Sequence, residues 1–221
     1  MTPAASDGVH PEDYPRARVC AGILAGGQGR RMGGADKGLV ELAGRPMVLH
    51  VISALQAQAG SILISANRNL DRYGRLGYPV LPDRGPGFAG PLAGMAALMV
   101  ASDAPWLLVV PCDSPFLPPD LGPRLWRAAR ASGADAAVVQ VHGRLQPVFA
   151  LLRGSLRQRL LADVAAGWRK AGAWLRAQDL VAVDFSDHAE RFFNVNTAEQ
   201  HQWLVRRLDP ANPARGGQET P

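Results

Sequence analysis

A glycine-rich segment with three cations is the part of the chain best suited to chemistry. Residues 24–37 have the sequence LAGGQGRRMGGADK and follow directly after a short apolar run. Glycines let a backbone turn tightly and come close to a ligand, and their N–H groups can face phosphate oxygens. Arg30, Arg31 and Lys37 add positive charge. The segment is therefore predicted to cradle a polyphosphate.

The spacing of this segment excludes two common phosphate-binding motifs. A P-loop has Gly-Lys followed by Ser or Thr, whereas Lys37 follows Asp36 and precedes Gly38. A dinucleotide-binding fingerprint has a third glycine three residues after its second, but Met32 occupies that position after Gly29. A flexible solvent loop is the alternative, which five glycines and three cations directly after a buried strand disfavour.

A single carboxylate, Asp113, is the second candidate for chemistry. It follows the apolar run 106–110, within the sequence PCDSP at residues 111–115. A carboxylate at the carboxyl end of a buried strand can bind a hard cation such as Mg²⁺ through oxygen. Taken alone, Asp113 could equally cap the next turn, as Asp before Ser-Pro often does. The glycine-rich segment in the same sheet favours metal binding.

Short apolar runs alternate with helical patterns along the chain, and these are the elements that must position both candidates. Such alternation predicts a mostly parallel sheet with helices on both faces, in which ligands bind beyond the carboxyl ends of the strands. Strands are expected over 18–24, 61–65, 79–81, 106–110, 136–141, 148–152 and 180–184, and helices over 46–59, 92–101, 119–131, 156–166 and 197–208.

Composition places these elements in one domain between two tails. The chain has 221 residues, 47% hydrophobic and 19% charged, which suits a full core and excludes wholesale disorder. Residues 1–15 and 209–221 are polar and lack periodicity, so mobile tails are expected around a domain over 16–208. Residues 1–15 lack the features of a signal peptide, and prolines interrupt the uncharged run 85–102. A cytoplasmic protein without a membrane span is expected.

The remaining charged and reactive residues point away from other functions. Lys+Arg 24 against Asp+Glu 19 gives a net charge of +5, but the cations form neither a block nor a stripe interleaved with aromatics. This pattern disfavours nucleic-acid binding. Cys20 and Cys112 lack the spacing of a disulfide framework or a zinc site and are expected to be buried. The five histidines also lack zinc-motif spacing.

Four motifs are distributed along the domain expected over residues 16–208, and the resemblance that they carry covers nearly all of it. They are LAGGQGRRMGGADKGLVELAGRPM from residue 24, GPLAGM at 90–95, PCDSPFLPPDL at 111–121 and FNVNTAEQ at 193–200. In order and spacing they resemble the molybdenum cofactor guanylyltransferases, nucleotidyltransferases with a Rossmann-like fold. The resemblance implies a single-domain α/β protein that transfers GMP from GTP to the terminal phosphate of molybdenum-loaded molybdopterin and releases pyrophosphate.

The resemblance also implies roles for individual residues. Asp113 would bind Mg²⁺, the expected cofactor, and Arg31 and Lys37 would neutralise charge on the triphosphate. Asp83 could accept hydrogen bonds from N1–H and the exocyclic amine of guanine, although it could equally be a turn residue. Ser65 stands where the family commonly has Asn, with Asn67 two residues later. The implied nucleotide contacts are Leu24, Ala25, Gly26, Gly27, Lys37, Ser65, Asp83 and Asp113.

On the acceptor side the resemblance implies Gln146, Asn194 and Asn196. Gln146 precedes Pro147 where relatives often have His-Pro, which leaves this contact less defined. The two asparagines precede a helix with a capping box, and their amides can bind phosphate or complete a metal shell; ordinary turn chemistry is the alternative. GTP and the molybdopterin cofactor are the expected partners. Because such cofactors are labile, delivery to a molybdenum insertion protein or a recipient molybdoenzyme is also expected.

Three other functions would fit a similar pocket. They are a cytidylyltransferase for the same cofactor, a sugar-phosphate nucleotidyltransferase, and a non-catalytic nucleotide-binding module for cofactor delivery. The tetrad LAGG at 24–27 favours guanine, because cytidylyl relatives generally carry LAAG, and Gly27 is expected to occupy the deciding place. A non-catalytic module could dispense with the metal carboxylate, so Lys37 and Asp113 together argue against it.

Overall fold

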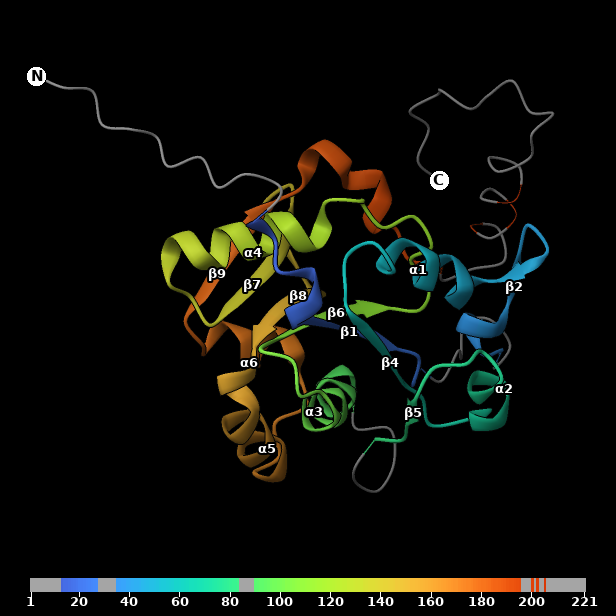
Figure 1. Cartoon of the computed structure of the whole chain (residues 1–221), viewed down its shortest axis with the longest axis horizontal. Helices are drawn as coiled ribbons and strands as arrows, with labels where there is room; N and C mark the ends of the chain where they lie inside the picture. The colour runs from blue at the N-terminus through green and yellow to red at the C-terminus, as the bar shows by residue number, and fades with distance from the viewer. Residues whose placement is uncertain are drawn as a thin grey trace, which may run out of the picture.

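A seven-stranded sheet in the order β5-β4-β1-β6-β8-β7-β9 forms the centre of the computed structural model, which describes residues 13–27, 35–83, 90–195, 200, 202 and 205 (Figure 1). In this sheet β8 pairs antiparallel with β6 and β7, whereas the other pairs are parallel. The predicted, mostly parallel sheet is thus confirmed. Its strands are β1 (Val19–Leu24), β4 (Ser61–Ser65), β5 (Val80–Leu81), β6 (Trp106–Pro111), β7 (Ala136–Val141), β8 (Arg144–Arg153) and β9 (Leu180–Asp184).

Helices cover both faces of the sheet, as the alternating pattern predicts. On one face lie α1 (Met47–Leu55) and α4 (Leu121–Ser132), and on the other lie α3 (Pro91–Ala101), α5 (Arg157–Ala165) and α6 (Ala171–Arg176) (Figure 1). The smaller elements are a hairpin of β2 (Glu41–Leu42) and β3 (Arg45–Pro46), the helix α2 (Leu70–Gly74), and the 3₁₀ turns η2 (Arg16–Arg18), η4 (Lys37–Leu39), η5 (Gly154–Leu156) and η6 (Ser186–Phe192).

The central strand β6 shows why the apolar runs contain no alternating polar residues. Leu108 and Val110 pack into the core beneath α1 and α4, whereas Leu107 and Val109 pack into the core beneath α3 and α5. All four side chains are at most 1% exposed. A strand covered on both faces must be apolar at every position, because each side chain enters a core.

The uncharged run 85–102 ends in the core helix α3. Residues 92–99 are all buried, and residues 84–89 lie outside the described part of the chain. The helix packs directly on β1, since a Cβ on Gly22 would lie only 2.8 Å from Cδ1 of Leu98. Among the described residues, no helix combines the length and apolar character needed to cross a bilayer.

Some elements differ from those predicted. The helix expected over 46–59 is the shorter α1, because Gln58 turns inward to donate to Pro118 O at 3.0 Å and accept from Gly122 N at 2.8 Å. The strand expected over 148–152 extends to Arg144, because a tight turn lets β8 pair back onto β7. This turn uses His142 and Gly143, both with positive φ. The sequence patterns did not predict α2, α6 or the β2–β3 hairpin.

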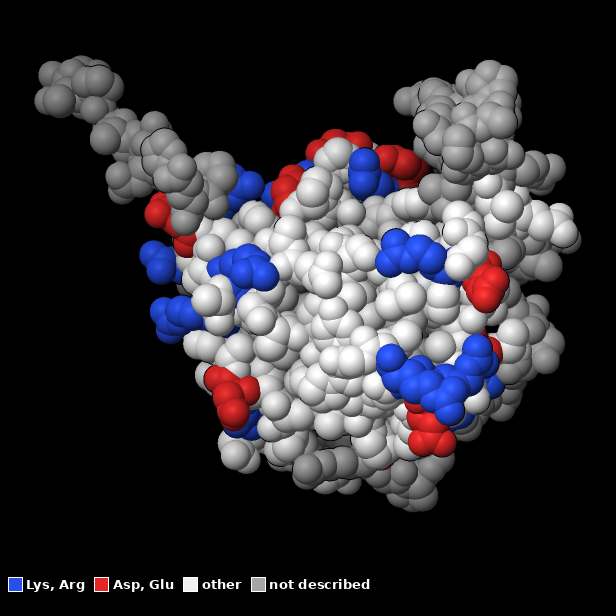
Figure 2. Space-filling model, turned by 45° about the vertical axis from the view of Figure 1, so that its right-hand side comes forward, with Lys and Arg blue, Asp and Glu red and all other residues white. Residues whose placement is uncertain are grey.

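Several terminal expectations lie mostly outside the described residues. Of the tails expected over 1–15 and 209–221, only residues 13–15 are described. Of the helix expected over 197–208, residues 200, 202 and 205 are described and are helical. On the face drawn in Figure 2, Lys and Arg side chains form separate groups, several beside Asp or Glu, around a wide area without charge. The basic surplus on this face is therefore dispersed.

Candidate active site

The candidate residues gather at one edge of the sheet. Because β1, β4, β5 and β6 are parallel and in register, with Leu24 opposite both Ser65 and Pro111 and Ser65 opposite Leu81, their carboxyl ends lie side by side. The start of the glycine-rich segment is held between two of them: Cys112 N donates to Leu24 O at 3.0 Å, and Ala25 N donates to Ser65 O at 2.7 Å. The segments that leave this edge are residues 25–27, 66–69, 82–83 and 112–114.

Lys37 and Asp113 form an ion pair at this edge. Lys37 Nζ lies 3.0 Å from Asp113 Oδ2, and the two side chains are 20% and 11% exposed. The carboxylate of Asp113 is thus bound by a cation from the glycine-rich segment, and no turn N–H among the described residues donates to it. The backbone of Asp113 is also held, because its carbonyl accepts from Val195 N at 3.1 Å.

Asp113 also fits the expected Mg²⁺ ion. Mg²⁺ keeps several waters and is typically held by one or two carboxylates together with substrate phosphates, so a protein cage is not required. Among the described residues, no group of three or more His, Cys, Asp or Glu side chains could hold a metal ion by itself. A single, nearly buried carboxylate beside a cationic, glycine-rich segment suits an ion that arrives with a triphosphate.

Asp83 lies in a polar cluster with Ser65 and Asn67. Ser65 Oγ donates to its Oδ1 at 2.9 Å, and Asn67 Nδ2 donates to its Oδ2 at 2.7 Å. Asn67 Oδ1 in turn accepts from Asp83 N at 2.8 Å. Ser65 and Asn67 both therefore orient the carboxylate that is expected to meet guanine.

The space beside Asp83 depends on glycines. A Cβ on Gly26 would lie 3.0 Å from Asn67 Nδ2 and 3.8 Å from Asp83 Oδ2, and one on Gly94 would lie 2.9 Å from Ser65 Oγ. A Cβ on Gly27 would meet no atom of the described residues within 4 Å. LAGG and LAAG differ at their third letter, which is Gly26. The difference between the two tetrads therefore falls on Gly26 rather than on the expected Gly27, and of these two glycines only Gly26 lies where a Cβ would contact a described atom of the Asp83 cluster.

Of the three expected acceptor-side residues, Asn194 and Gln146 lie at the same edge of the sheet. Asn194 Oδ1 accepts from Ser114 Oγ at 2.6 Å, which places Asn194 against the residue that directly follows Asp113 in the chain. Gln146 is half-buried near the start of β8, and this start faces the same edge because β8 runs antiparallel to β6. Arg31 and Asn196 lie outside the described residues.

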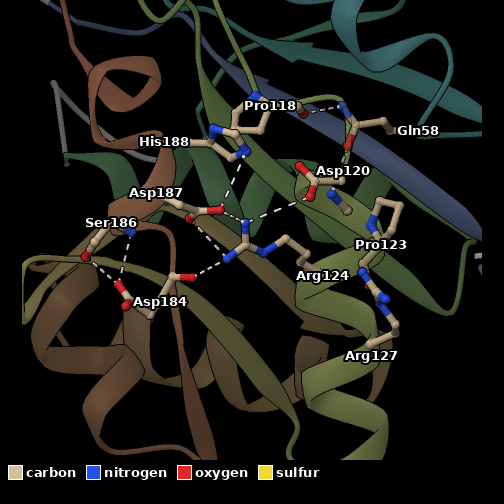
Figure 3. A network of polar contacts seen from close by, with 11 residues as sticks. Gln58, Pro118, Asp120, Pro123, Arg124, Arg127, Asp184, Ser186, Asp187 and His188 are labelled. Atoms are coloured by element: carbon tan, nitrogen blue, oxygen red, sulfur yellow. Dashed lines mark hydrogen bonds and ion pairs between the residues drawn. The ribbon is translucent and has the colours of Figure 1, made fainter. Parts of the chain in front are cut away.

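A polar network beside α4 holds the segment that leads to Asn194. The Arg124 guanidinium donates to both carboxylate oxygens of Asp187, at 2.8 and 3.2 Å, and to Asp184 O (Figure 3). These hydrogen bonds hold the pKa of Asp187 below its ordinary value, and hydrogen bonds from Ser186 do the same for Asp184. The end of β9 and η6 are thereby tied to α4.

The sequence patterns did not predict a buried polar cluster around Asp36. Asp36 Oδ1 accepts from the Tyr73 hydroxyl at 2.6 Å, and its Oδ2 accepts from Asn69 Nδ2 at 2.9 Å. Arg68 Nε lies 3.6 Å from the same Oδ2. Burial, with smaller effects of Cys112 and Asp36, raises the pKa of Tyr73 well above its ordinary value. The signal in the sequence was an Asp directly before the candidate lysine.

Cys20 and Cys112 are both buried free cysteines, as expected. Burial raises the pKa of the Cys112 thiol, and the adjacent Asp113 adds to this effect. A buried, protonated thiol is a poor nucleophile. Cys112 therefore contributes to the packing beneath the site.

Comparison with known proteins gives a consistent result. Residues 21–183 match the MobA-like NTP transferase domain family. The chain is 50% identical over 188 residues to a molybdenum cofactor guanylyltransferase of Shewanella halifaxensis, covering 85% of this chain and 94% of the relative. It is 49% identical over 191 residues to the enzyme of the same name from Shewanella loihica, covering 86% and 97%.

Solved structures share the fold. The molybdopterin-guanine dinucleotide biosynthesis protein A of Archaeoglobus fulgidus superposes with a TM-score of 0.70 at 22% identity, covering 84% of this chain and 96% of that one. The 2-C-methyl-D-erythritol 4-phosphate cytidylyltransferase of Thermus thermophilus superposes with a TM-score of 0.63 at 18% identity, covering 83% and 96%. The Rossmann-like fold expected from the motifs is confirmed.

Proposed function

The chain belongs to the molybdenum cofactor guanylyltransferase family, and from that premise we propose how its own residues carry out the transfer. GMP passes from GTP to the terminal phosphate of molybdenum-loaded molybdopterin, and pyrophosphate leaves. Guanylyl transfer in the synthesis of the dinucleotide cofactor follows from the family. The assignment of residues, the metal and the leaving group are the proposal.

The Lys37–Asp113 ion pair is the single observation that carries this proposal. It joins a cation from a glycine-rich segment to a carboxylate in the loop after the central strand β6, at a separation of 3.0 Å. A site that only held a nucleotide would have no need of a carboxylate at the triphosphate, because a negative group there repels the ligand. A carboxylate paired with a cation and able to bind a divalent ion suits phosphoryl transfer.

The chemistry requires positioning more than proton transfer. The acceptor phosphate is already an oxyanion, so no side chain has to act as a nucleophile. The enzyme must align acceptor and α-phosphate and neutralise the charge that develops on the departing pyrophosphate. Lys37 and the N–H groups of Gly26 and Gly27 are assigned to phosphate oxygens, with Arg31 assigned the same task from the motif.

Asp113 would hold Mg²⁺, which when bound supplies positive charge to the α-phosphate and orients it. Lys37 Nζ donates to Asp113 Oδ2 in the described structure and fixes the orientation of the carboxylate. The same ammonium group is assigned to a phosphate oxygen once a nucleotide enters. Leu24 and Ala25 contribute backbone that is already fixed by β4 and β6.

Guanine recognition is assigned to Asp83. Its two oxygens are oriented by Ser65 and Asn67, and a carboxylate can accept both N1–H and the exocyclic amine of guanine. Gly26 and Gly94 keep the space beside it open. On the acceptor side Gln146, Asn194 and Asn196 are assigned to molybdopterin, with Asn194 oriented by Ser114.

The test is pyrophosphate release from the purified protein with Mg²⁺ and molybdenum-loaded molybdopterin, offered GTP, CTP or ATP separately. Release with GTP alone, lost in Asp113→Ala, is expected. Release with CTP would assign the chain to cytidylyl transfer. GTP binding without release would indicate a nucleotide-binding delivery module, and release with a sugar phosphate as acceptor would indicate a sugar-phosphate enzyme.

We also propose that the enzyme acts in the cytoplasm, where GTP is available. The dinucleotide product would then pass to a molybdenum insertion protein or a recipient molybdoenzyme. Pull-down of the product-loaded protein with candidate apo-molybdoenzymes, compared with the empty protein, tests this step.

A further inference from the structure

Asp36 is a buried carboxylate with an extensive set of partners and no task in the proposed reaction. Its side chain is 5% exposed. The Tyr73 hydroxyl and the Asn69 amide each donate to one of its oxygens, at 2.6 and 2.9 Å, and Arg68 lies 3.6 Å away. All three partners come from residues 68–73, which follow β4. A buried charge is stable only when such hydrogen bonds satisfy it.

Gly38, which follows Lys37 in the chain, packs against the same tyrosine. A Cβ on Gly38 would lie 2.4 Å from the Tyr73 hydroxyl and 3.2 Å from both Cβ and Sγ of Cys112. The backbone at Gly38 is therefore packed closely between Tyr73 and Cys112, the residue that precedes Asp113. Tyr73 thus reaches the residues on both sides of Lys37, one by a hydrogen bond and the other by direct contact.

The partners of Asp36 belong to a segment that is itself well anchored. Tyr73 is fully buried, and the backbone of Asn69 has a positive φ of 51° that turns the chain into α2. Asn67, two residues earlier, holds Asp83. The segment 65–73 therefore supplies two sets of hydrogen-bond donors. Ser65 and Asn67 orient Asp83, the residue proposed to bind guanine, and Asn69 and Tyr73 bind Asp36.

We propose that Asp36 and Tyr73 are positioning residues for Lys37, which hold the backbone of residues 36–38 so that the lysine ammonium stays against Asp113 and the nucleotide phosphates. The inference rests on the proposed function of Lys37. The restraint on residues 36–38 comes from α2, by way of the Tyr73 hydroxyl.

Tyr73→Phe is the primary test, because it removes one hydroxyl and leaves the buried ring in place. Tyr14→Phe is the matched control, since its hydroxyl also donates at 2.6 Å, to Gln58 O, away from the candidate site. We expect Tyr73→Phe to lower kcat for pyrophosphate release about tenfold, with the KM for GTP changed less than about twofold. Tyr14→Phe is expected to leave kcat unchanged.

Two further variants separate positioning from folding. In a Lys37→Ala background, measured by single turnover with excess enzyme, Tyr73→Phe is expected to cause no additional loss, because it acts through the missing lysine. Asn69→Gly removes the other hydrogen bond to Asp36 from an exposed residue and keeps the positive φ. It is expected to lower kcat about threefold even if Tyr73→Phe does not fold.

Lysine-selective ¹³C labelling reports the same contact without turnover. The chain has only two lysines, Lys37 and Lys170, so two side-chain Cε signals are expected and Lys170→Arg assigns them. Tyr73→Phe should shift the Lys37 signal and leave the Lys170 signal unchanged, and Tyr14→Phe should shift neither.

The inference would be overturned if the unsubstituted enzyme is active and both Tyr73→Phe and Asn69→Gly keep its kcat. It would also be overturned if Tyr73→Phe lowers the rate as much in the Lys37→Ala background as in the unsubstituted enzyme. An unmoved Lys37 signal in Tyr73→Phe would do the same. Absence of pyrophosphate release from the unsubstituted protein would instead count against the proposed function, while the labelling experiment would still decide whether Tyr73 positions Lys37.

Discussion

Lys37 Nζ lies 3.0 Å from Asp113 Oδ2, although 76 residues separate the two in the chain. One group comes from the segment after β1 and the other from the loop after β6, and these neighbouring strands are paired along their whole length. The pair therefore depends on the sheet, and the proposed chemistry depends on the pair.

Replacing Lys37 with Met tests the role of the ammonium. The aliphatic stem is kept, so the fold and the melting temperature should change little, whereas kcat should fall about 10²- to 10³-fold because charge on the departing pyrophosphate is no longer neutralised. Pyrophosphate release and thermal unfolding, measured together, check this. Arg16→Met is the control, because Arg16 is an exposed cation that hydrogen-bonds Gln56 O before β1. Equal losses in both variants would mean that Lys37 has no specific role.

Adding a methyl group at Gly26 tests base selection. In Gly26→Ala the new Cβ would lie 3.0 Å from Asn67 Nδ2 and disturb the cluster around Asp83. We expect kcat/KM for GTP to fall about 10- to 100-fold, a size typical of misplaced polar contacts. Gly27→Ala, whose Cβ would meet no atom within 4 Å in the part of the chain that the structure describes, should lose less GTP activity. The reverse ranking of the two variants, measured with GTP and CTP, would restore Gly27 as the deciding position.

Asp83→Asn tests whether this carboxylate accepts from guanine. Ser65 and Asn67 donate to its two oxygens, so the NH₂ group of an asparagine would face one of these donors. The substitution also removes the negative charge that strengthens the hydrogen bonds. We expect kcat/KM for GTP to fall about 10²-fold. ITP lacks the exocyclic amine, so the preference for GTP over ITP should shrink in the variant. A preference that survives the substitution would place guanine recognition elsewhere.

The Arg124–Asp187 contact predicts a pH-dependent stability. Because hydrogen bonds from Arg124 lower the pKa of Asp187 in the folded state, the contact stabilises the protein above the ordinary pKa of Asp, about 3.9. This stabilisation is lost as the pH falls through the lowered pKa. Asp187→Asn should thus be less stable than the unsubstituted protein at pH 7, and the difference should vanish in acid. Urea unfolding at a series of pH values measures it.

NMR titration of Asp187 supplies the complementary check. In Arg124→Gln the donors are gone, so the pKa of Asp187 should rise toward its ordinary value. A pKa that stays low in Arg124→Gln would show that another group is responsible.

The sequence alone was sufficient for the sheet and for the residue types at its edge. Runs such as 106–110 are apolar at every position, and this local pattern indicates a strand buried on both faces whatever its partners are. Glycines and cations after one such strand, and Asp113 after another, then predict a phosphate site by the general rule that ligands bind at the carboxyl edge. The resemblance in the motifs supplied the reaction.

The tertiary structure decided which of these residues meet. Asp36 looks like one more polar loop residue until α2 places Tyr73 and Asn69 against it. The tetrad LAGG singles out Gly26 by its position, but only the nearby Asn67 shows what a Cβ there would contact. Such distances depend on packing between elements far apart in the chain, whereas sequence patterns report each element's local preference. For that reason the sequence was enough to predict the edge of the sheet, and the fold was needed to find what holds Lys37 there.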